Sequence, residues 1–358
     1  MKKVCLIDYN LSIRGGVEQV TASLANALAD YYEVHILSLC GDGKTAYALD
    51  ARVRFRRVLS KETRLRQMQR LACPIVKRYF HENGIEVAII QGNYPGFLMA
   101  PLRWMGKTKL IFCDHGALMN QWHQKDIVVL RYIAAKACHN VVTLTAQSQN
   151  DYIRRFHLKK KRVRCIYNWI DLAIPHSQNY SKESKRIVSA GRFGKEKGFD
   201  MLVKAFAPVA EKHPDWTLDL FGDGEMMPTV KRLISELGLE AQVKLLGMRT
   251  DLSQRYGEYA MYVLPSYREG MPLVLLEAKA NRLPIISFDI MTGPREIVQD
   301  GVDGILIPPY NLEQMGAAMC RLIEEPELRE SMSARSQDNL QKFSKETILK
   351  QWRQLIEE

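Results

Sequence analysis

Two cations in a glycine-rich segment of the second half of the chain are suited to bind an anionic ligand. Arg192 and Lys197 stand in the run GRFGKEKG, residues 191–198, directly after the β-rich apolar run 187–190. In a doubly wound sheet the loop after a strand faces the ligand crevice, so both cations would point there. Two fixed positive charges match a diphosphate, whereas the alternative is a solvated basic loop.

Two carboxylates follow later in the chain, in the segment EGMPLVLLE. Glu269 precedes a helix that we predict over residues 273–281, and Glu277 lies inside this helix. A carboxylate on a largely buried helix needs hydrogen-bond donors, and ribose hydroxyls at a crevice would supply them to Glu277. The alternatives are a favourable charge near a helix N-terminus for Glu269 and a solvated helix position for Glu277.

The start of the same helix is itself suited to bind phosphate. Pro272 fits the first helical position, because proline lacks the N–H group that would be unpaired there. The backbone N–H groups of Gly270, Met271 and the first helical turn would then be free to meet phosphate oxygens.

Three further segments place candidate residues directly after predicted strands. Gly15 and Gly16 lie between the first strand and a helix, where the backbone can approach a ligand closely. Gly222 occupies a similar place in FGDGE, and His115 follows the strand predicted over residues 109–112. Tight turns explain the glycines equally well, and a buried, hydrogen-bonded role is the alternative for the histidine.

Strands and amphipathic helices alternate along the whole chain, which predicts an α/β fold of two Rossmann-like, doubly wound domains. The linker is expected at residues 173–185, which are rich in Ser, Asn and Pro. We predict domains over residues 1–172 and 173–340, followed by a helical segment, 341–358. The predicted strands span residues 4–7, 33–39, 53–58, 87–90, 109–112, 141–144, 163–166, 187–190, 217–221, 243–246, 261–264, 284–287 and 304–307.

Composition excludes several classes of protein. The 358 residues are 46% hydrophobic and 25% charged, as in ordinary globular domains. No stretch approaches the roughly 18 apolar residues of a membrane span, and no secretory signal is expected at the N-terminus. The seven cysteines form no CxxC pair, and we expect them to be reduced in a cytosolic protein that uses no metal and has no His/Cys cluster to hold one.

Taken together, these segments resemble the retaining family 4 glycosyltransferases of the GT-B architecture, in which two Rossmann-like domains face each other across a nucleotide-sugar cleft. The resemblance covers nearly the whole chain, and the two glutamates in EGMPLVLLE are its most specific part. The matching segments are GGVE at 15–18, CDHG around His115, YNWID around Asn168, GRFGKEKG at 191–198, FGDGE at 221–225 and EGMPLVLLE at 269–277.

The resemblance implies a role for most candidate residues. Arg192 and Lys197 would bind the diphosphate of a nucleoside diphosphate sugar, Glu269 the sugar hydroxyls and Glu277 the ribose. Gly16 would pass close to the phosphates, and His115 would lie against the donor sugar. The first domain would hold the acceptor and the second the nucleotide sugar, and the C-terminal helix, 341–358, would cross back to the first domain. The family works without a metal, and no Asp-x-Asp triplet occurs in the chain. No cofactor is implied beyond the donor, which family frequency suggests is a UDP-sugar.

The base would be read by backbone groups around Met248. The acceptor is expected to be a glycan or a polyprenyl-linked sugar, in the synthesis of cell-surface polysaccharide or glycolipid. A nucleotide-sugar epimerase on the same fold is the alternative enzyme, although the matched segments follow the transferase pattern. A basic nucleic-acid-binding protein is the alternative class, but no recognition module interleaves aromatic with basic residues.

Positive charge is concentrated in the first half of the chain. The first 180 residues contain 27 Lys and Arg against 13 Asp and Glu, and the rest 24 against 27. Residues 52–78 alone carry ten cations and one acid, and an apolar series at helical spacing lies among them: Leu65, Met68, Ala72, Ile75 and Tyr79. A second cluster comprises Arg154, Arg155 and residues 159–162. We expect this domain to bind an anionic membrane surface, which places the protein peripherally on the inner face of the cell membrane. The alternative is a solvated basic face whose apolar series packs on its own sheet, as in an ordinary Rossmann crossover helix.

Overall fold

The computed structural model describes residues 1–171, 180–249 and 251–358, and these residues form two compact units. The first unit comprises Met1–Tyr167 together with Leu349–Glu358, and the second comprises Asn168–Ile348. The linker predicted at residues 173–185 lies partly outside the described residues. The first unit ends five residues earlier than the predicted domain, and the last ten residues of the chain pack with it.

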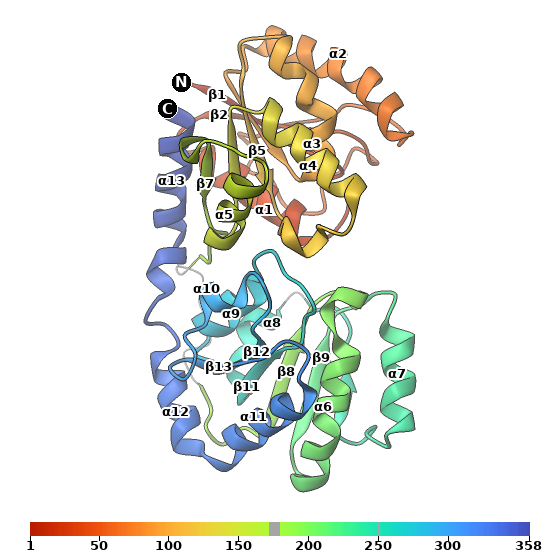
Figure 1. The fold of residues 1–358 in the computed structure, drawn as a ribbon, viewed down its shortest axis with the longest axis vertical. Helices are drawn as coiled ribbons and strands as arrows, with labels where there is room; N and C mark the ends of the chain where they lie inside the picture. Colours follow the sequence, from red (N-terminus) through yellow and green to blue (C-terminus); the bar gives the residue numbers. More distant parts are fainter. Residues whose placement is uncertain (172–179, 250) are drawn as a thin grey trace. The chain divides into compact units, whose positions relative to one another are not determined.

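The first unit is a parallel sheet of seven strands in the order β3-β2-β1-β4-β5-β6-β7 (Figure 1). Its strands are β1 Lys3–Asp8, β2 Glu33–Ser38, β3 Arg54–Arg57, β4 Val87–Gln91, β5 Lys109–Asp114, β6 Asn140–Thr143 and β7 Val163–Cys165. Its main helices are α1 Gly16–Leu28, α2 Leu65–Asn83, α3 Asn93–Met99, α4 Lys125–Ala137 and α5 Ala146–Arg155.

One face of this sheet is covered by α2, α3, α4 and α5. Alternate residues of the strands, such as Cys5 and Ile7 of β1, share one apolar cluster with Met68, Val76 and Tyr152 from the helices. Side chains of successive strand residues point to opposite faces, so this alternation fixes which residues of β1 meet the helices.

The second unit is a parallel sheet of six strands in the order β10-β9-β8-β11-β12-β13. Its strands are β8 Arg186–Ala190, β9 Thr217–Phe221, β10 Val243–Leu245, β11 Met261–Leu264, β12 Ile285–Phe288 and β13 Gly304–Ile307. Its helices are α6 Phe199–Lys212, α7 Met227–Glu236, α8 Leu252–Arg255, α9 Leu273–Ala280, α10 Pro294–Ile297, α11 Leu312–Glu324 and α12 Pro326–Arg335. Residues from α6, α7 and α11 share its main apolar cluster.

The C-terminal helix, α13 (Lys345–Glu357), is tied to the first unit by three cations. Lys2 Nζ lies 2.9 Å from a Glu357 carboxylate oxygen, and Lys109 Nζ donates to the Leu355 carbonyl at 2.6 Å. Arg164 pairs with Glu358 at 3.0 Å. Positive groups at a helix C-terminus satisfy its unpaired carbonyls, which explains why the two chain ends lie together in Figure 1.

The structure confirms the predicted α/β class and all thirteen predicted strands, within one or two residues at their ends. None of the helices in the described part of the chain has the length and apolar character that a bilayer crossing requires. One local expectation is wrong: Pro272 caps α9 in an extended conformation, and the helix begins at Leu273.

Candidate functional site

An ion pair joins two of the predicted site residues in the second unit. Lys197 Nζ lies 2.7 and 3.0 Å from the two carboxylate oxygens of Glu269. Ser266 Oγ donates to the same carboxylate at 2.6 Å, and the Thr292 hydroxyl donates to the Glu269 backbone carbonyl at 2.6 Å. Glu269 is buried, whereas the Lys197 side chain keeps 24% of its exposure. A partly exposed lysine can exchange this partner for a ligand anion.

The pair forms because the loops after the adjacent strands β8 and β11 approach each other closely. Gly198 has a φ of +67°, and a Cβ atom at this position would lie 2.3 Å from the Pro265 carbonyl oxygen. The Tyr267 N–H also donates to the Glu196 carbonyl at 2.8 Å. Only glycine permits this approach without moving the backbone, so Gly198 sets the position of Lys197.

Gly222 has a similar structural task between the loops after β8 and β9. Its φ is +129°, and a Cβ atom would lie 1.8 Å from the Gly191 carbonyl oxygen. Its N–H donates to the Gly247 carbonyl at 2.9 Å, which links the loop after β10 as well. The adjacent Met248 side chain is 61% exposed. Contact between loops is therefore sufficient to explain Gly222 without a ligand.

Arg192 lies on the same loop as Lys197 but in a different environment. Its side chain is 73% exposed, and Nη2 donates to Glu196 Oε1 at 2.7 Å. This hydrogen bond raises the pKa of Arg192 and is the main influence on it, so the guanidinium stays charged. The neighbouring carboxylate holds the side chain near the loop while leaving most of it accessible.

Glu277 is half-buried on α9 beside a tyrosine hydroxyl that has no hydrogen-bond partner among the described residues. Burial raises the pKa of Glu277 from its ordinary value of 4.5 to about 7, and the Tyr256 hydroxyl opposes this shift. Tyr256 itself is fully buried. A ligand hydroxyl beside Glu277 could supply the hydrogen bond that the buried Tyr256 hydroxyl lacks among the described residues.

Gly270 and Met271 adjoin a loop that the sequence analysis did not single out. Gly293 has a φ of +100°, and a Cβ atom there would lie 2.7 Å from Pro272 Cδ and 3.4 Å from the Gly270 carbonyl oxygen. The Met271 sulfur accepts from the Asn168 N–H at 3.2 Å, and its side chain is buried. The Gly-Pro dipeptide after strand β12 was the available sequence signal for this third loop.

The first unit holds the remaining predicted residues at the carboxyl edge of its sheet. Gly15 precedes α1 with an extended backbone, and a Cβ atom there would meet the Glu18 carboxylate at 2.3 Å. In the described part of the chain, no atom beyond the chain neighbours and the backbone of α1 lies within 4 Å of the corresponding position at Gly16. His115 follows β5, and its Nε2 lies 2.6 Å from the Gln91 side-chain oxygen. Burial lowers the pKa of His115 to about 4, so the ring is neutral at physiological pH.

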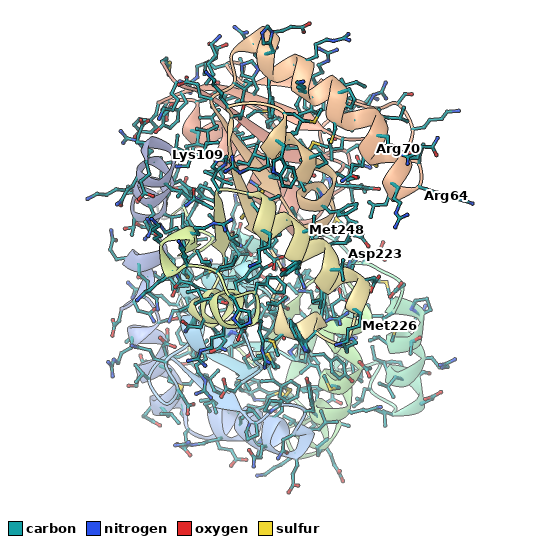
Figure 2. All side chains as sticks on the ribbon, turned by 45° about the horizontal axis from the view of Figure 1, so that its top comes forward. Arg64, Arg70, Lys109, Asp223, Met226 and Met248 are labelled. Atoms are coloured by element: carbon teal, nitrogen blue, oxygen red, sulfur yellow. The ribbon has the colours of Figure 1, made fainter. Side chains whose placement is uncertain are left out.

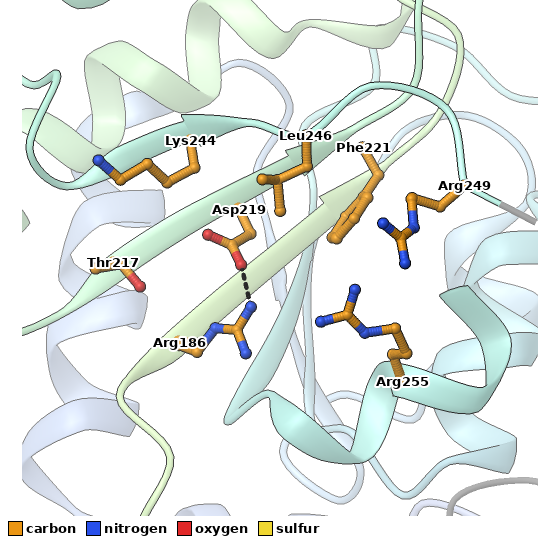
Figure 3. Close-up of a pocket in the computed structure, with 8 residues that line it drawn as sticks. All are labelled: Arg186, Thr217, Asp219, Phe221, Lys244, Leu246, Arg249 and Arg255. Atoms are coloured by element: carbon orange, nitrogen blue, oxygen red, sulfur yellow. Dashed lines mark hydrogen bonds and ion pairs between the residues drawn. The ribbon is translucent and has the colours of Figure 1, made fainter. Parts of the chain in front are cut away.

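A cavity of about 360 Å³ lies elsewhere in the second unit, beside β9 (Figure 3). None of its lining residues is a predicted site residue; they are Arg186, Thr217, Asp219, Phe221, Lys244, Leu246, Arg249 and Arg255. Its three guanidinium groups already have carboxylate partners: Asp219 at 2.6 Å for Arg186, Asp251 at 2.9 Å for Arg249 and Glu258 at 2.8 Å for Arg255. These carboxylates partly neutralise the guanidinium groups that line the cavity.

The expectation that the chain has no His/Cys cluster is wrong. His213, Cys320 and Glu324 bring potential metal-ligand atoms within 4.8 Å of one another. The cluster lies past the C-terminal end of α6, whereas the loop carrying Lys197 precedes the N-terminal end of this helix. Glu324 already pairs with Lys212 at 2.6 Å. Residues far apart in sequence meet here, so spacing along the chain could not reveal the cluster.

The raised pKa of Glu277 predicts a pH-dependent stability. The folded chain holds this proton up to about pH 7 and the unfolded chain only to about its ordinary pKa of 4.5, so the folded state binds more protons between these values. The free energy of unfolding therefore falls as pH rises through this range. Replacing Glu277 with Gln should raise the melting temperature at pH 8 by a few degrees and change it little at pH 5. An equal shift at both pH values would contradict this assignment.

Two family models match adjoining parts of the chain. The model described as "Glycosyltransferase Family 4" matches residues 14–174, and the model described as "Glycosyl transferases group 1" matches residues 173–339. An uncharacterized glycosyltransferase of Haemophilus influenzae is 29% identical over 99% of this chain and 100% of its own length.

Two further proteins are similar over their full length. The N-acetylgalactosamine-N,N'-diacetylbacillosaminyl-diphospho-undecaprenol 4-alpha-N-acetylgalactosaminyltransferase of Campylobacter jejuni is 25% identical, with 97% of each chain covered. The structure of HepE from Anabaena in complex with UDP-glucose matches with a TM-score of 0.83 and 20% identity, over 100% of both chains. The two parallel α/β sheets and the adjoining family matches show that the chain belongs to the family 4 glycosyltransferases of GT-B architecture, which are retaining, metal-independent enzymes.

Proposed function

We propose that this enzyme transfers a hexose or N-acetylhexosamine from a UDP-sugar to a hydroxyl of a glycan or polyprenyl-linked acceptor. The observation that carries the proposal is the Lys197–Glu269 pair, held at 2.7 Å where the loops after β8 and β11 meet. A cation for phosphate and a carboxylate for sugar hydroxyls are thereby adjacent. The reaction would serve the synthesis of cell-surface polysaccharide or glycolipid.

Binding of the donor would rearrange the charges in this site. Lys197 would turn part of its hydrogen bonding from Glu269 to the diphosphate, and the exposed Arg192 would add a second positive charge. These cations and the N–H groups near Gly270 and Met271 would stabilise the departing UDP electrostatically, without solvent reorganisation. Glu269, still held by Ser266, would accept hydrogen bonds from sugar hydroxyls.

The remaining residues would hold the other parts of the donor. Glu277 would accept from the ribose hydroxyls, and backbone groups near Met248 would read the base. In the first unit, Gly15 and Gly16 would let the backbone approach the phosphates, and His115 would contact the donor sugar. The leaving phosphate would take the proton of the acceptor hydroxyl on the same face of the sugar, so no protein nucleophile is required.

The relatives support the choice of substrates. The Campylobacter jejuni protein is named for a diphospho-undecaprenol acceptor, and HepE was solved with UDP-glucose. A polyprenyl carrier is confined to a membrane, so an enzyme that uses one must reach the membrane surface.

A face of α2 is suited to such a surface, although its apolar residues match those predicted only in part. Met68, Ala72 and Tyr79 are buried against the sheet of their own unit, so this part of the predicted membrane-facing series is wrong. Ile75, which belongs to the predicted series, is 36% exposed, and Leu71, which does not, is 47% exposed, beside exposed Pro74. Exposed cations flank them, and Figure 2 shows two of these, Arg64 and Arg70, projecting outward: Arg64, Arg66, Arg70, Lys77 and Arg78.

Other apolar and basic groups extend or limit this surface. Trp104, which follows α3, is 78% exposed, and aromatic side chains of this kind favour the membrane–water boundary. Arg162, by contrast, donates to the carbonyls of Ala135 and Cys138 at the end of α4. Its guanidinium therefore caps a helix, and the second predicted cluster loses one cation. We propose that α2 and Trp104 bring the enzyme to the inner face of the cell membrane.

The donor site can be tested by removing either of two charged groups that are proposed to bind the nucleotide, Lys197 and Glu277. Lys197→Ala and Glu277→Ala should each lower turnover or donor binding by about 10-fold to 100-fold, because each loses a charge-assisted hydrogen bond worth roughly 1.5–3 kcal/mol. Release of UDP from a UDP-sugar measures the effect. Lys212→Ala and Glu324→Ala, which break an ion pair at the other end of α6, are matched controls and should retain activity. Near-normal turnover in both site variants would refute the assignment.

The choice of donor can be tested by screening nucleotide sugars with and without EDTA. A UDP-sugar should raise the melting temperature and be hydrolysed slowly, and EDTA should leave this activity unchanged. The cluster of His213, Cys320 and Glu324 lies away from Lys197, so removing a metal from it should not affect the transfer reaction. Loss of activity in EDTA that manganese restores would contradict the proposal.

The membrane proposal predicts salt-sensitive binding to anionic vesicles. Each basic side chain near such a surface contributes about 1 kcal/mol, so four engaged residues suffice for clear flotation with phosphatidylglycerol vesicles. Changing Arg64, Arg66 and Arg70 to Glu should abolish flotation. The same charge change at exposed Lys231, Arg232 and Lys244 of the second unit is the control and should preserve it. Binding that ignores lipid charge, or equal loss in both triple variants, would remove the idea.

A further inference from the structure

A buried glutamine makes direct contact with His115. Gln91 is the last residue of β4, and β4 pairs with β5 in a register that sets Gln91 opposite Cys113. His115 therefore begins the neighbouring loop only two residues further on. The Gln91 side chain is 1% exposed, and its Oε1 lies 2.6 Å from His115 Nε2.

The chemistry of this contact determines where the imidazole carries its proton. An amide oxygen can only accept a hydrogen bond, so His115 Nε2 must donate. The ring is neutral at physiological pH because burial lowers the pKa of His115 to about 4, with Asp114 opposing this shift. A neutral imidazole holds one proton, so Nδ1 is left as a hydrogen-bond acceptor.

Buried charged side chains hold the turn that carries His115 in place. The Asp114 carboxylate accepts from the Gly116 N–H at 3.1 Å and from the Tyr152 hydroxyl at 2.7 Å. It also pairs with Arg131 at 3.1 Å, where both side chains are only 2% exposed. A Cβ atom at Gly116 would lie 2.3 Å from Arg131 Nη2, so the turn rests directly on the guanidinium. The backbone on both sides of His115 is thus held in place.

The other end of the Gln91 amide is a second, independent observation. Its Nε2 group is buried and has no hydrogen-bond partner among the described residues. Leaving such a donor unpaired costs roughly 1–3 kcal/mol, and an unpaired buried group in a native protein calls for an explanation. A functional constraint on the orientation of the amide oxygen supplies one.

We propose that Gln91 is a positioning residue that holds His115 as its Nε2–H tautomer, so that Nδ1 accepts a hydrogen bond from a hydroxyl of the donor sugar. This inference rests on the proposed placement of His115 beside that sugar. The sugar hydroxyl then donates to a fixed acceptor, which orients the ring of the donor for transfer. Gln91 acts through His115 and need not touch the substrate.

The tautomer can be measured directly on the full chain without substrate. In protein labelled with 15N-histidine, long-range 1H–15N correlation spectra distinguish protonated from unprotonated ring nitrogens, and His115→Asn assigns the signals. We expect a protonated Nε2 and an unprotonated Nδ1 for His115 from pH 6 to 8. The opposite tautomer would overturn the proposal, whatever the activity of the protein.

Variants of Gln91 then separate positioning from a structural role. Gln91→Leu should produce a mixture of tautomers and lower kcat about tenfold or more, with a smaller change in the donor KM. Gln91→Glu should raise the pKa of His115, since a carboxylate stabilises the imidazolium, and should move the acidic limb of the pH–rate profile upward. Gln69→Leu, which removes a 2.8 Å hydrogen bond to the Phe97 carbonyl in the same unit, is the control and should leave the His115 signals unchanged.

The outcomes are distinguishable. The Nε2–H tautomer without any UDP-sugar turnover would refute the proposed function but leave the role of Gln91 on the tautomer intact. An unchanged tautomer in Gln91→Leu, or an unchanged His115 pKa in Gln91→Glu, would refute the positioning role even in a fully active enzyme. Should Gln91→Leu fail to fold, the wild-type spectrum and Gln91→Glu still decide the question.

Discussion

The close approach of backbone loops at one sheet edge is the constraint on which the proposed donor site depends. Lys197 and Glu269 can meet at 2.7 Å only because Gly198 lets its loop lie against Pro265. Gly222 allows the same kind of close contact, with Gly191, in the loop after the neighbouring strand β9. In each case a side chain larger than hydrogen would push neighbouring loops apart. Glycines in this site therefore act mainly by allowing loops to pack, and the charged residues depend on that packing.

Local patterning was sufficient to predict the strands but not their arrangement. A short apolar run between turn residues, such as 261–264, indicates a buried, extended segment, and the structure has a strand there. It does not state which strand lies next to it. The orders β3-β2-β1-β4 and β10-β9-β8-β11 follow from crossover connections, which are properties of the folded chain. Pro272 was expected at the first helical position and is instead the N-cap of α9, with an extended backbone.

The candidate site likewise contains some residues that local sequence patterns predict and others that they do not. Lys197 and Glu269 could be predicted because their charge, spacing and place after strands are written in the sequence. The sequence could not predict Gln91, Tyr256 and Thr292, because the role of each depends on a contact with a residue that is distant in the chain. The prediction of the exposed apolar residues of α2 was partly wrong for a related reason. Met68 and Leu71 both lie in an amphipathic pattern, and only the packing of the helix on its sheet shows that Met68 is buried and Leu71 is exposed.

Two of the ion pairs described above, Asp114–Arg131 and Lys197–Glu269, differ in a way that suits different tasks. Asp114 and Arg131 are almost fully excluded from water, so breaking their pair would leave an uncompensated charge and cost several kcal/mol. Such a pair can support a turn but cannot easily exchange partners. Lys197 remains 24% exposed next to Glu269, so water can stabilise it while it moves to another anion. The Asp114–Arg131 pair is therefore suited to hold the turn of His115 in one position, whereas the Lys197–Glu269 pair is suited to respond to the charge of a ligand.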